Sequence, residues 1–248
     1  MADRPPAREE RLQPVRDLAT ALGLSDTRIG VTIDGNIPVG KGYASSTADI
    51  MASIGALADA ACPGAPDAVV AALGSLVAGD IEWGDYVLSE SIALCLQRTH
   101  TLVRKYPTDL RWRIVGVDEG GTVDTAAFHR RQRESGTLAR HYATLLTRMD
   151  AALATNDSAT AARIATESAL LNQRVLPRRH FDLMRRIAGT TGALGIAVAH
   201  TGTVIGLIFS AHQSDLSLRM WEADRCLRRE HLTSSVFTLR EDGRPLTR

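Results

Sequence analysis

The sequence predicts an α+β fold, and three features of the chain favour it. A β-prone run, Ile29–Ile33, leads through a glycine-containing loop into a small-residue segment that is compatible with a helix through Ala60. Helical patterns then follow one another from Ser135 to Thr190. Two apolar runs within Gly195–Phe209 flank a His-Thr-Gly-Thr turn, as in a β-hairpin. Strands and helices mixed in this way are typical of α+β domains.

Prolines and glycines set the expected bounds of the first elements. A proline in its first turn and a glycine after its last residue predict a helix over Pro14–Leu22. A break at residues 63–66 separates a helix from about Ser46 to Ala61 from another over Asp67–Ala78. We expect strands over Arg28–Asp34 and Leu110–Val117. We expect a loop over Gly79–Asp85, a turn over Asp118–Thr122 and the start of a helical region at Asp124–Phe128. The pattern of Tyr86–Leu96 does not decide between helix and strand. Beyond these we expect helices over Ser135–Ala154, Ser158–Asn172, His180–Thr190 and Asp215–Arg229, and a last strand over Ser234–Leu239.

Composition narrows the class of protein. The chain has 248 residues, 44% of them hydrophobic and 23% charged, with a net charge of +1, which argues against nucleic acid or a membrane as the main partner. Its three cysteines are far apart and its seven histidines form no pair with ligand spacing, so neither a disulfide framework nor a zinc site is expected. The charged N-terminus is no signal peptide, and the apolar segment 193–209 is too polar to span a bilayer. These features indicate a cytoplasmic protein.

The segment Pro38–Asp49 predicts a phosphate-binding loop. Gly40 and Gly42 allow the backbone to approach a ligand, and the N–H groups at the start of the following helix face an anion. The hydroxyls of residues 45–47 suit phosphate oxygens or a metal ion. The alternative is an ordinary capped helix. A Walker A motif is excluded, because Gly42 occupies the position that requires a magnesium-binding Ser or Thr.

A second glycine turn and several acids are further candidates. The segments Gly192–Gly195 and His200–Thr203 could lie against the same phosphates, or could simply belong to a β-hairpin. Glu82 and Asp85 share a face if their segment is helical, and could then serve a divalent ion and a substrate hydroxyl, although surface acids beside a turn are common. The acids at 118, 119 and 124 could equally be turn and capping residues.

Several segments in order carry a resemblance to a known family. Ile37–Asp49 resembles the phosphate-binding motif of the GHMP small-molecule kinases, in the version found in the L-threonine kinases of cobalamin biosynthesis: Pro-Val-Gly-Lys-Gly, one variable residue, then Ala-Ser-Ser-Thr-Ala-Asp. Glu82–Asp85, Asp118–Phe128 and Val198–Val204 resemble further stretches of the same subfamily, the last being its third motif, and Ser168–Gln173 also fits. The likeness runs from about residue 29 to residue 210.

The resemblance implies a two-lobe α+β fold, with an N-terminal lobe over residues 1–125 and a ferredoxin-like C-terminal lobe over residues 126–248. It also implies ATP and Mg²⁺ as cofactors and phosphoryl transfer to the hydroxyl of L-threonine or a similar hydroxy amino acid. Asp85 would orient or deprotonate that hydroxyl, and Lys41 would neutralise phosphate charge. The implied nucleotide-binding residues are Pro38, Val39, Gly40, Lys41, Gly42, Tyr43, Ala44, Ser45, Ser46, Thr47, His200, Thr201 and Gly202. The implied metal ligands are Ser45 or Ser46, and Glu82.

The chain departs from the family pattern in two places. No Pro-Ala-Ser-Cys-Gly-Glu-like motif precedes Ile29, so an N-terminal lobe that is incomplete at its start is expected. The residues after Asp85 also differ from the family's sequence near the acceptor. Two alternatives therefore stay open: a kinase for homoserine or another hydroxy amino acid in specialised metabolism, and a catalytically inactive nucleotide-binding relative. The oligomeric state, including a homodimer, is open as well.

Overall fold

The computed structural model describes residues 16, 19–20, 32–61, 63–64, 92–97, 99, 101–106, 110–123, 128 and 138–238. The chain divides into two compact units, one comprising residues 1–39 and 43–105, the other residues 40–42 and 106–248. The short loop 40–42 therefore belongs to the second unit, although the residues on both sides of it belong to the first. The lobe boundary expected between residues 125 and 126 stays a prediction.

The first unit contains the helix α2 (Ser45–Ala61) and the strands β1 (Ile92–Leu96) and β2 (Thr101–Tyr106), of which β2 ends at the unit boundary. α2 confirms the helix expected over residues 46–61. Its alanines favour a helix, and Ile50, Ile54 and Leu57 form one buried stripe. β1 and β2 pair as a two-stranded sheet. β1 resolves part of the undecided segment as a strand, whereas the sequence did not predict β2.

The strand expected over Arg28–Asp34 is wrong in its described part. Residues 32–34 belong to no strand, and Thr32 and Asp34 are exposed. Strand formation depends on pairing and burial more than on backbone preference, and no described strand pairs with these residues. The described residues of the expected first helix, at 16 and 19–20, are helical, and so is Phe128. The helix expected over 67–78, the loop 79–85 and Asp124 lie outside the described residues.

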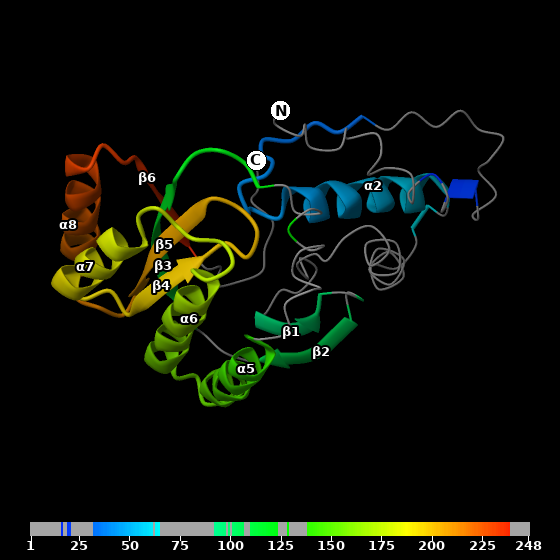
Figure 1. Ribbon diagram of the computed structural model, residues 1–248. Coiled ribbons are helices and arrows are strands. Elements are labelled where there is room, and N and C mark those ends of the chain that lie inside the picture. Colours follow the sequence, from blue (N-terminus) through cyan, green and yellow to red (C-terminus); the bar gives the residue numbers. More distant parts are fainter. Residues whose placement is uncertain are drawn as a thin grey trace. The chain divides into compact units, whose positions relative to one another are not determined.

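The second unit has the ferredoxin-like arrangement that was expected. After β3 (Trp112–Asp118) come the helices α5 (Ala139–Ala154), α6 (Ser158–Asn172) and α7 (Phe181–Thr191), then β4 (Gly195–Val198), β5 (Val204–Ser210), α8 (Leu216–Arg229) and β6 (Ser234–Thr238). The four strands form an antiparallel sheet in the order β4-β5-β3-β6 (Figure 1). This is a split β-α-β-β-α-β topology, in which β5 inserts between β4 and β3.

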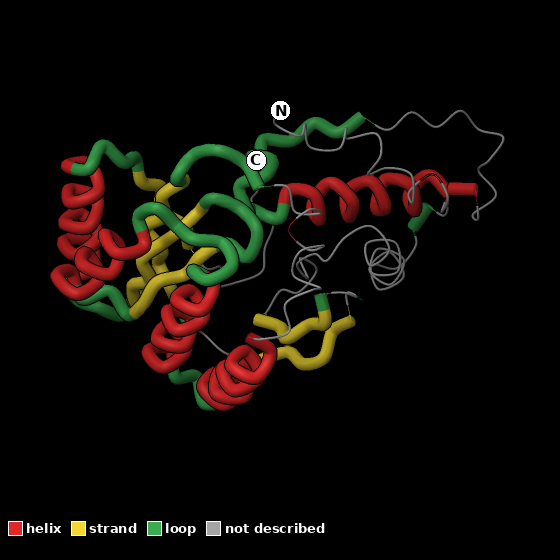
Figure 2. The backbone as a smooth tube through the Cα atoms, in the orientation of Figure 1, coloured by secondary structure: helices red, strands yellow, loops and turns green. Residues whose placement is uncertain are grey.

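The core of this unit lies between the sheet and the helices α7 and α8, which run along one side of it (Figure 2). Alternate residues of β3 and β5 face these helices, as the two-residue period of a strand requires. The core residues include Val115, Val117, Ile205, Leu207 and Phe209 from the strands, and Phe181, Met184, Ile187, Ala223 and Leu227 from the helices.

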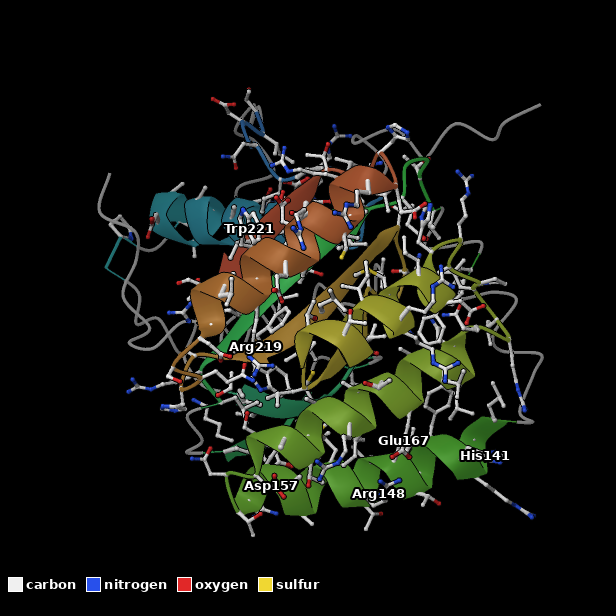
Figure 3. The ribbon with its side chains drawn as sticks, turned by 90° about the vertical axis from the view of Figure 1, so that its left-hand side faces the viewer. His141, Arg148, Asp157, Glu167, Arg219 and Trp221 are labelled. Atoms are coloured by element: carbon white, nitrogen blue, oxygen red, sulfur yellow. The ribbon has the colours of Figure 1, made fainter. Side chains whose placement is uncertain are left out.

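The helices α5 and α6 form a hairpin that also protects an edge of the sheet. Asp157 caps α6 by accepting a hydrogen bond from the Thr160 N–H at 2.9 Å. Arg148 of α5 and Glu167 of α6 point toward each other in a two-pronged ion pair of 2.5 and 2.7 Å (Figure 3). Thr166 accepts the Ile196 N–H at 2.8 Å, so α6 covers the edge strand β4.

Candidate functional site

The loop 40–42 needs its glycines, for a reason that the sequence did not reveal. Gly40 and Gly42 have φ of 73° and 90°, a region that residues with a Cβ rarely adopt. A Cβ on Gly42 would overlap the Ala199 Cβ and lie 2.9 Å from the Thr201 carbonyl oxygen. A Cβ on Gly40 would lie 3.1 Å from the Thr122 Cβ. The predicted reason was close approach to a ligand, but in this unit the neighbour of each glycine is the protein's own chain.

The second glycine turn lies directly against this loop. Thr203 N–H donates to the Lys41 carbonyl at 3.0 Å, and Val123 N–H donates to the Gly40 carbonyl at 3.1 Å. Gly202, with φ of 155°, is so close that a Cβ there would overlap the Lys41 carbonyl group. The structure thus brings the turn 199–202 together with the loop 40–42. That both face the same phosphates stays a prediction. The exposed His200 also packs edge-on against Phe128, with ring centroids 5.8 Å apart.

The Lys41 ammonium group is held by Asp118 at the end of β3. Their Nζ and Oδ2 atoms are 2.8 Å apart, and the Lys41 side chain is only 19% exposed. The other Asp118 oxygen, Oδ1, accepts hydrogen bonds from the Thr203 hydroxyl at 2.5 Å and from Gly120 N–H at 3.0 Å. By accepting the hydrogen bond from Gly120, Asp118 acts as a turn residue, which is one of the roles that the sequence analysis considered for it. The pairing with Lys41 and Thr203 was missed, because it depends on long-range contacts, such as the end of β3 lying beside the start of β5.

These contacts lower the pKa of the Asp118 carboxyl group. Burial acts to raise its pKa, but the hydrogen bonds from Lys41, Thr203 and Gly120 outweigh burial and hold the pKa below the ordinary 3.8. A carboxylate with a lowered folded-state pKa stabilises the protein above pH 3.8, and this stabilisation disappears as the pH falls through the folded-state value. The carboxylate is therefore charged at neutral pH and holds Lys41 there.

We expect Asp118→Asn to lower the free energy of unfolding at pH 7 by about 1 kcal/mol, a modest value because water screens this partly exposed group. The deficit should shrink as the pH falls below 3.8, where wild type also loses its carboxylate charge. Urea unfolding at pH 7 and pH 3 measures both values. An Asp182→Asn control changes an exposed acid of α7, whose contact with Arg185 is 3.8 Å long, and should cost no more than about 0.5 kcal/mol. An equal deficit at both pH values would contradict the ion pair.

The start of α2, in the first unit, carries the predicted hydroxyls. Ser45 and Thr47 are buried, with 7% and 3% exposure, whereas Ser46 is half-buried. The preceding Ala44 has φ of 57°, and its carbonyl accepts the Ala48 N–H at 3.0 Å. The first N–H groups of a 17-residue helix have no acceptor within the helix and carry its positive dipole end. This donor set suits an anion. Pro38 and Val39, which precede the loop, are exposed.

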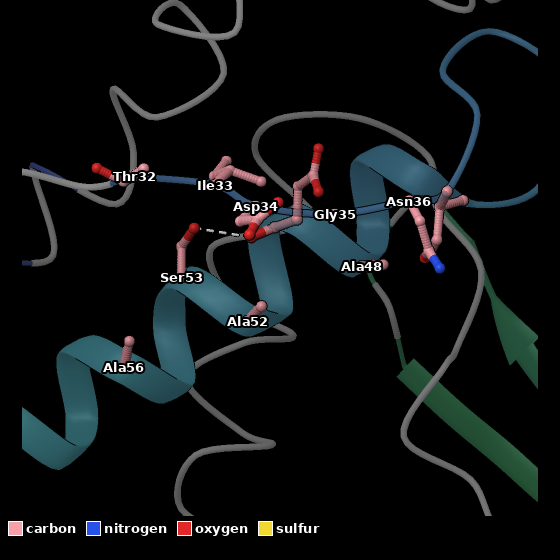
Figure 4. Close-up of a pocket in the computed structure, with 11 residues that line it drawn as sticks. Thr32, Ile33, Asp34, Gly35, Asn36, Ala48, Ala52, Ser53 and Ala56 are labelled. Carbon is pink, nitrogen blue, oxygen red and sulfur yellow. Dashed lines mark hydrogen bonds between the residues drawn. The ribbon is translucent and has the colours of Figure 1, made fainter. Parts of the chain in front are cut away.

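A cavity of about 280 Å³ lies beside α2 within the first unit (Figure 4). Ala48, Ala52 and Ala56 line it at a spacing of four residues, so one face of the helix is bare of large side chains. Ser53, whose hydroxyl donates to the Asp49 carbonyl at 2.7 Å, lies beside them. The remaining lining residues are Thr32, Ile33, Asp34, Gly35, Asn36, Ile37 and Asp49. The volume is near the lower limit for small-molecule pockets. The alanine spacing was a signal that sequence reasoning overlooked.

Glu82 and Asp85 lie outside the described residues, so their geometry stays a prediction. Among the residues that the structure describes, no group of three or more His, Cys, Asp or Glu side chains is arranged to hold a metal ion. In the same part of the chain, no helix is both long enough and apolar enough to cross a membrane.

Comparison with known proteins shows which family and which solved structures the chain is similar to. Residues 12–87, less than half of the chain, match the family described as GHMP kinases N terminal domain. The resemblance drawn from the ordered motifs is thereby confirmed at the family level. The chain is 26% identical over 195 residues to an L-threonine kinase from Citrobacter freundii, a match that covers 78% of this chain. It spans 66% of that enzyme's length, slightly less than two thirds.

Solved structures support the same fold. A homoserine kinase from Cytophaga hutchinsonii superimposes with a TM-score of 0.59 at 15% identity, covering 84% of this chain and 69% of that chain. A galactokinase from Lactococcus lactis in complex with galactose superimposes with a TM-score of 0.61 at 14% identity, covering 94% of this chain and 74% of that chain. The chain therefore has the fold of GHMP kinases.

Proposed function

We propose that this protein is an ATP-dependent kinase that phosphorylates the side-chain hydroxyl of L-threonine. The observation that carries the proposal is the similarity to the L-threonine kinase of Citrobacter freundii, which extends over 195 residues. The Pro-Val-Gly-Lys-Gly-Tyr-Ala-Ser-Ser-Thr-Ala-Asp sequence supports it, because it resembles the version of the phosphate motif found in that subfamily. The product, O-phospho-L-threonine, would serve cobalamin biosynthesis in the cytoplasm.

The phosphate-loop motif and the position of Lys41 support ATP with Mg²⁺ as the cofactors of the proposed reaction. Phosphoryl transfer depends mainly on positioning and charge neutralisation, which backbone N–H groups, a lysine and a metal ion can supply. Lys41 would contact phosphate oxygens while Asp118 holds its ammonium group. Ser45 or Ser46, with Glu82, would hold Mg²⁺, which would supply positive charge to neutralise the phosphates. Asp85 would accept the proton of the acceptor hydroxyl.

Homoserine is the second candidate acceptor, because a homoserine kinase is among the proteins that share this fold. Threonine and homoserine are isomers that differ in the position of the hydroxyl group. An active site that orients the amino acid correctly for one of them misplaces the reacting oxygen of the other. Discrimination of 10-fold or more is therefore expected, on the order of the effect of one misplaced group.

An assay of ADP release with L-threonine, L-homoserine and L-serine tests the proposal, with the phosphorylated product identified by mass spectrometry. We expect kcat/KM for L-threonine to exceed that for L-homoserine by roughly 10-fold or more. Omission of Mg²⁺ should abolish the reaction. Turnover of homoserine with threonine at background would overturn the choice of acceptor. Background rates with every acceptor, together with retained ATP binding, would overturn the kinase proposal.

A further inference from the structure

Arg178 is a buried cation that directly contacts the turn beside the candidate phosphate loop. It lies between α6 and α7 and is only 6% exposed. Its Nη2 donates to the Ala199 carbonyl at 2.6 Å, and its Nη1 donates to the Gly202 carbonyl. Its backbone N–H is fixed by the Gln173 side chain at 2.7 Å. The guanidinium thus joins the two ends of the turn 199–202.

The charge of Arg178 is balanced nearby. Burial lowers the pKa of its guanidinium, and the Glu119 carboxylate acts to raise it again. Glu119 is itself fixed, because its Oε1 accepts hydrogen bonds from His180 N–H at 2.6 Å and Nδ1 at 3.0 Å. The Glu119 N–H in turn donates to the Thr203 carbonyl at 3.0 Å. Glu119 therefore connects the start of α7, through His180, and the end of β3 to Thr203, the residue after the turn 199–202.

Burying the Arg178 guanidinium costs free energy, which indicates that this side chain has a role other than packing. Its Nε has no hydrogen-bond partner among the described residues. A buried donor without a partner is unfavourable, and a neutral side chain would avoid this cost. What the arginine supplies is a rigid, two-pronged donor for two carbonyl groups at once, which lysine cannot reproduce.

We propose that Arg178 is a positioning residue, which holds the turn 199–202 against the loop 40–42 and so presents that loop to the phosphates of the nucleotide. The coupling runs through the backbone, since Thr203 N–H bonds to the Lys41 carbonyl and Gly202 packs on the same peptide group. This inference rests on the proposed ATP-binding function. Arg178 itself need not contact the nucleotide.

Variants at 178 and 179 test the inference. Arg179 is exposed and adjacent, so Arg179→Lys and Arg179→Met are matched controls. We expect Arg178→Lys to raise KM for ATP about 10-fold and Arg178→Met about 100-fold, with kcat and KM for the amino acid changed less than about 3-fold. Without nucleotide, amide exchange of peptides covering 199–203 and 40–42 should be faster in both 178 variants than in the controls.

The two measurements separate the outcomes. Unchanged amide exchange in Arg178→Lys, or faster exchange with unchanged ATP affinity, would overturn the positioning role. Should Arg178→Met fail to fold, Arg178→Lys decides, because it keeps the charge and most of the volume. Wild-type protein that binds no ATP would instead refute the proposed function and the nucleotide part of this inference, whereas the exchange experiment would still show whether Arg178 holds the turn.

Discussion

Gly42→Ala is expected to weaken ATP binding by about 10²-fold, the size of effect that a displacement of about 1 Å produces in a positioned site. The new Cβ would overlap the Ala199 Cβ, and alanine would have to adopt φ of 90°. The loop 40–42 must then move away from the turn 199–202. Isothermal titration with a non-hydrolysable ATP analogue measures the affinity, and thermal unfolding reports whether the variant is folded.

Two further variants make this result specific. Gly189→Ala in α7 meets no atom within 4 Å, so it should leave ATP affinity unchanged and raise stability by about 1 kcal/mol. Adding Ala199→Gly to Gly42→Ala removes the overlap of the two Cβ atoms and should restore part of the affinity. Wild-type affinity in the single variant Gly42→Ala would contradict the placement of the loop against the turn.

Asp85→Asn is expected to lower kcat by about 10² to 10⁴-fold, the contribution typical of a general base. The amide cannot accept the hydroxyl proton, but it keeps the shape of the side chain, so the Kd for ATP should change less than about 3-fold. Single-turnover kinetics with L-threonine and ATP measure the chemical step, and equilibrium binding measures the nucleotide affinity.

Asp59→Asn is the matched control, because Asp59 is an exposed acid on α2. It should turn over substrate like wild type. Equal and negligible phosphorylation by wild type and Asp85→Asn, with ATP still bound, would indicate a protein that binds nucleotide without catalysis. A variant Asp85→Asn that keeps full activity would remove Asp85 from the role of base.

Local sequence signals predicted much of the second unit. The helix predicted over Ser158–Asn172 has those bounds in the structure, because an aspartate cap precedes it and a tight turn follows α5. The β4–β5 hairpin was predicted from its apolar runs and its polar turn. Helix caps and hairpin turns depend on residues within a few positions of one another, so one sequence contains the necessary information.

Signals that depend on long-range pairing were less reliable. The segment 32–34 has β propensity but no described partner strand, whereas Thr101–Tyr106 became a strand by pairing with β1. The partnership of Lys41 with Asp118 joins residues 77 positions apart, and that of Arg178 with Gly202 joins residues 24 apart. No local sequence pattern specifies which distant carboxylate or carbonyl group a lysine or arginine side chain will bind.

The sequence alone determined that this chain is an α+β protein and that its glycine-containing loop resembles the phosphate-binding motif of the GHMP kinases, because these features are encoded in short motifs and local periodicity. Only the tertiary structure decided what the loop rests on. The pairing of β3 with β5 brings Asp118 beside Thr203, and the packing of α6 and α7 buries Arg178 under the same turn. These contacts arise from sheet register and helix packing, which only the folded chain establishes.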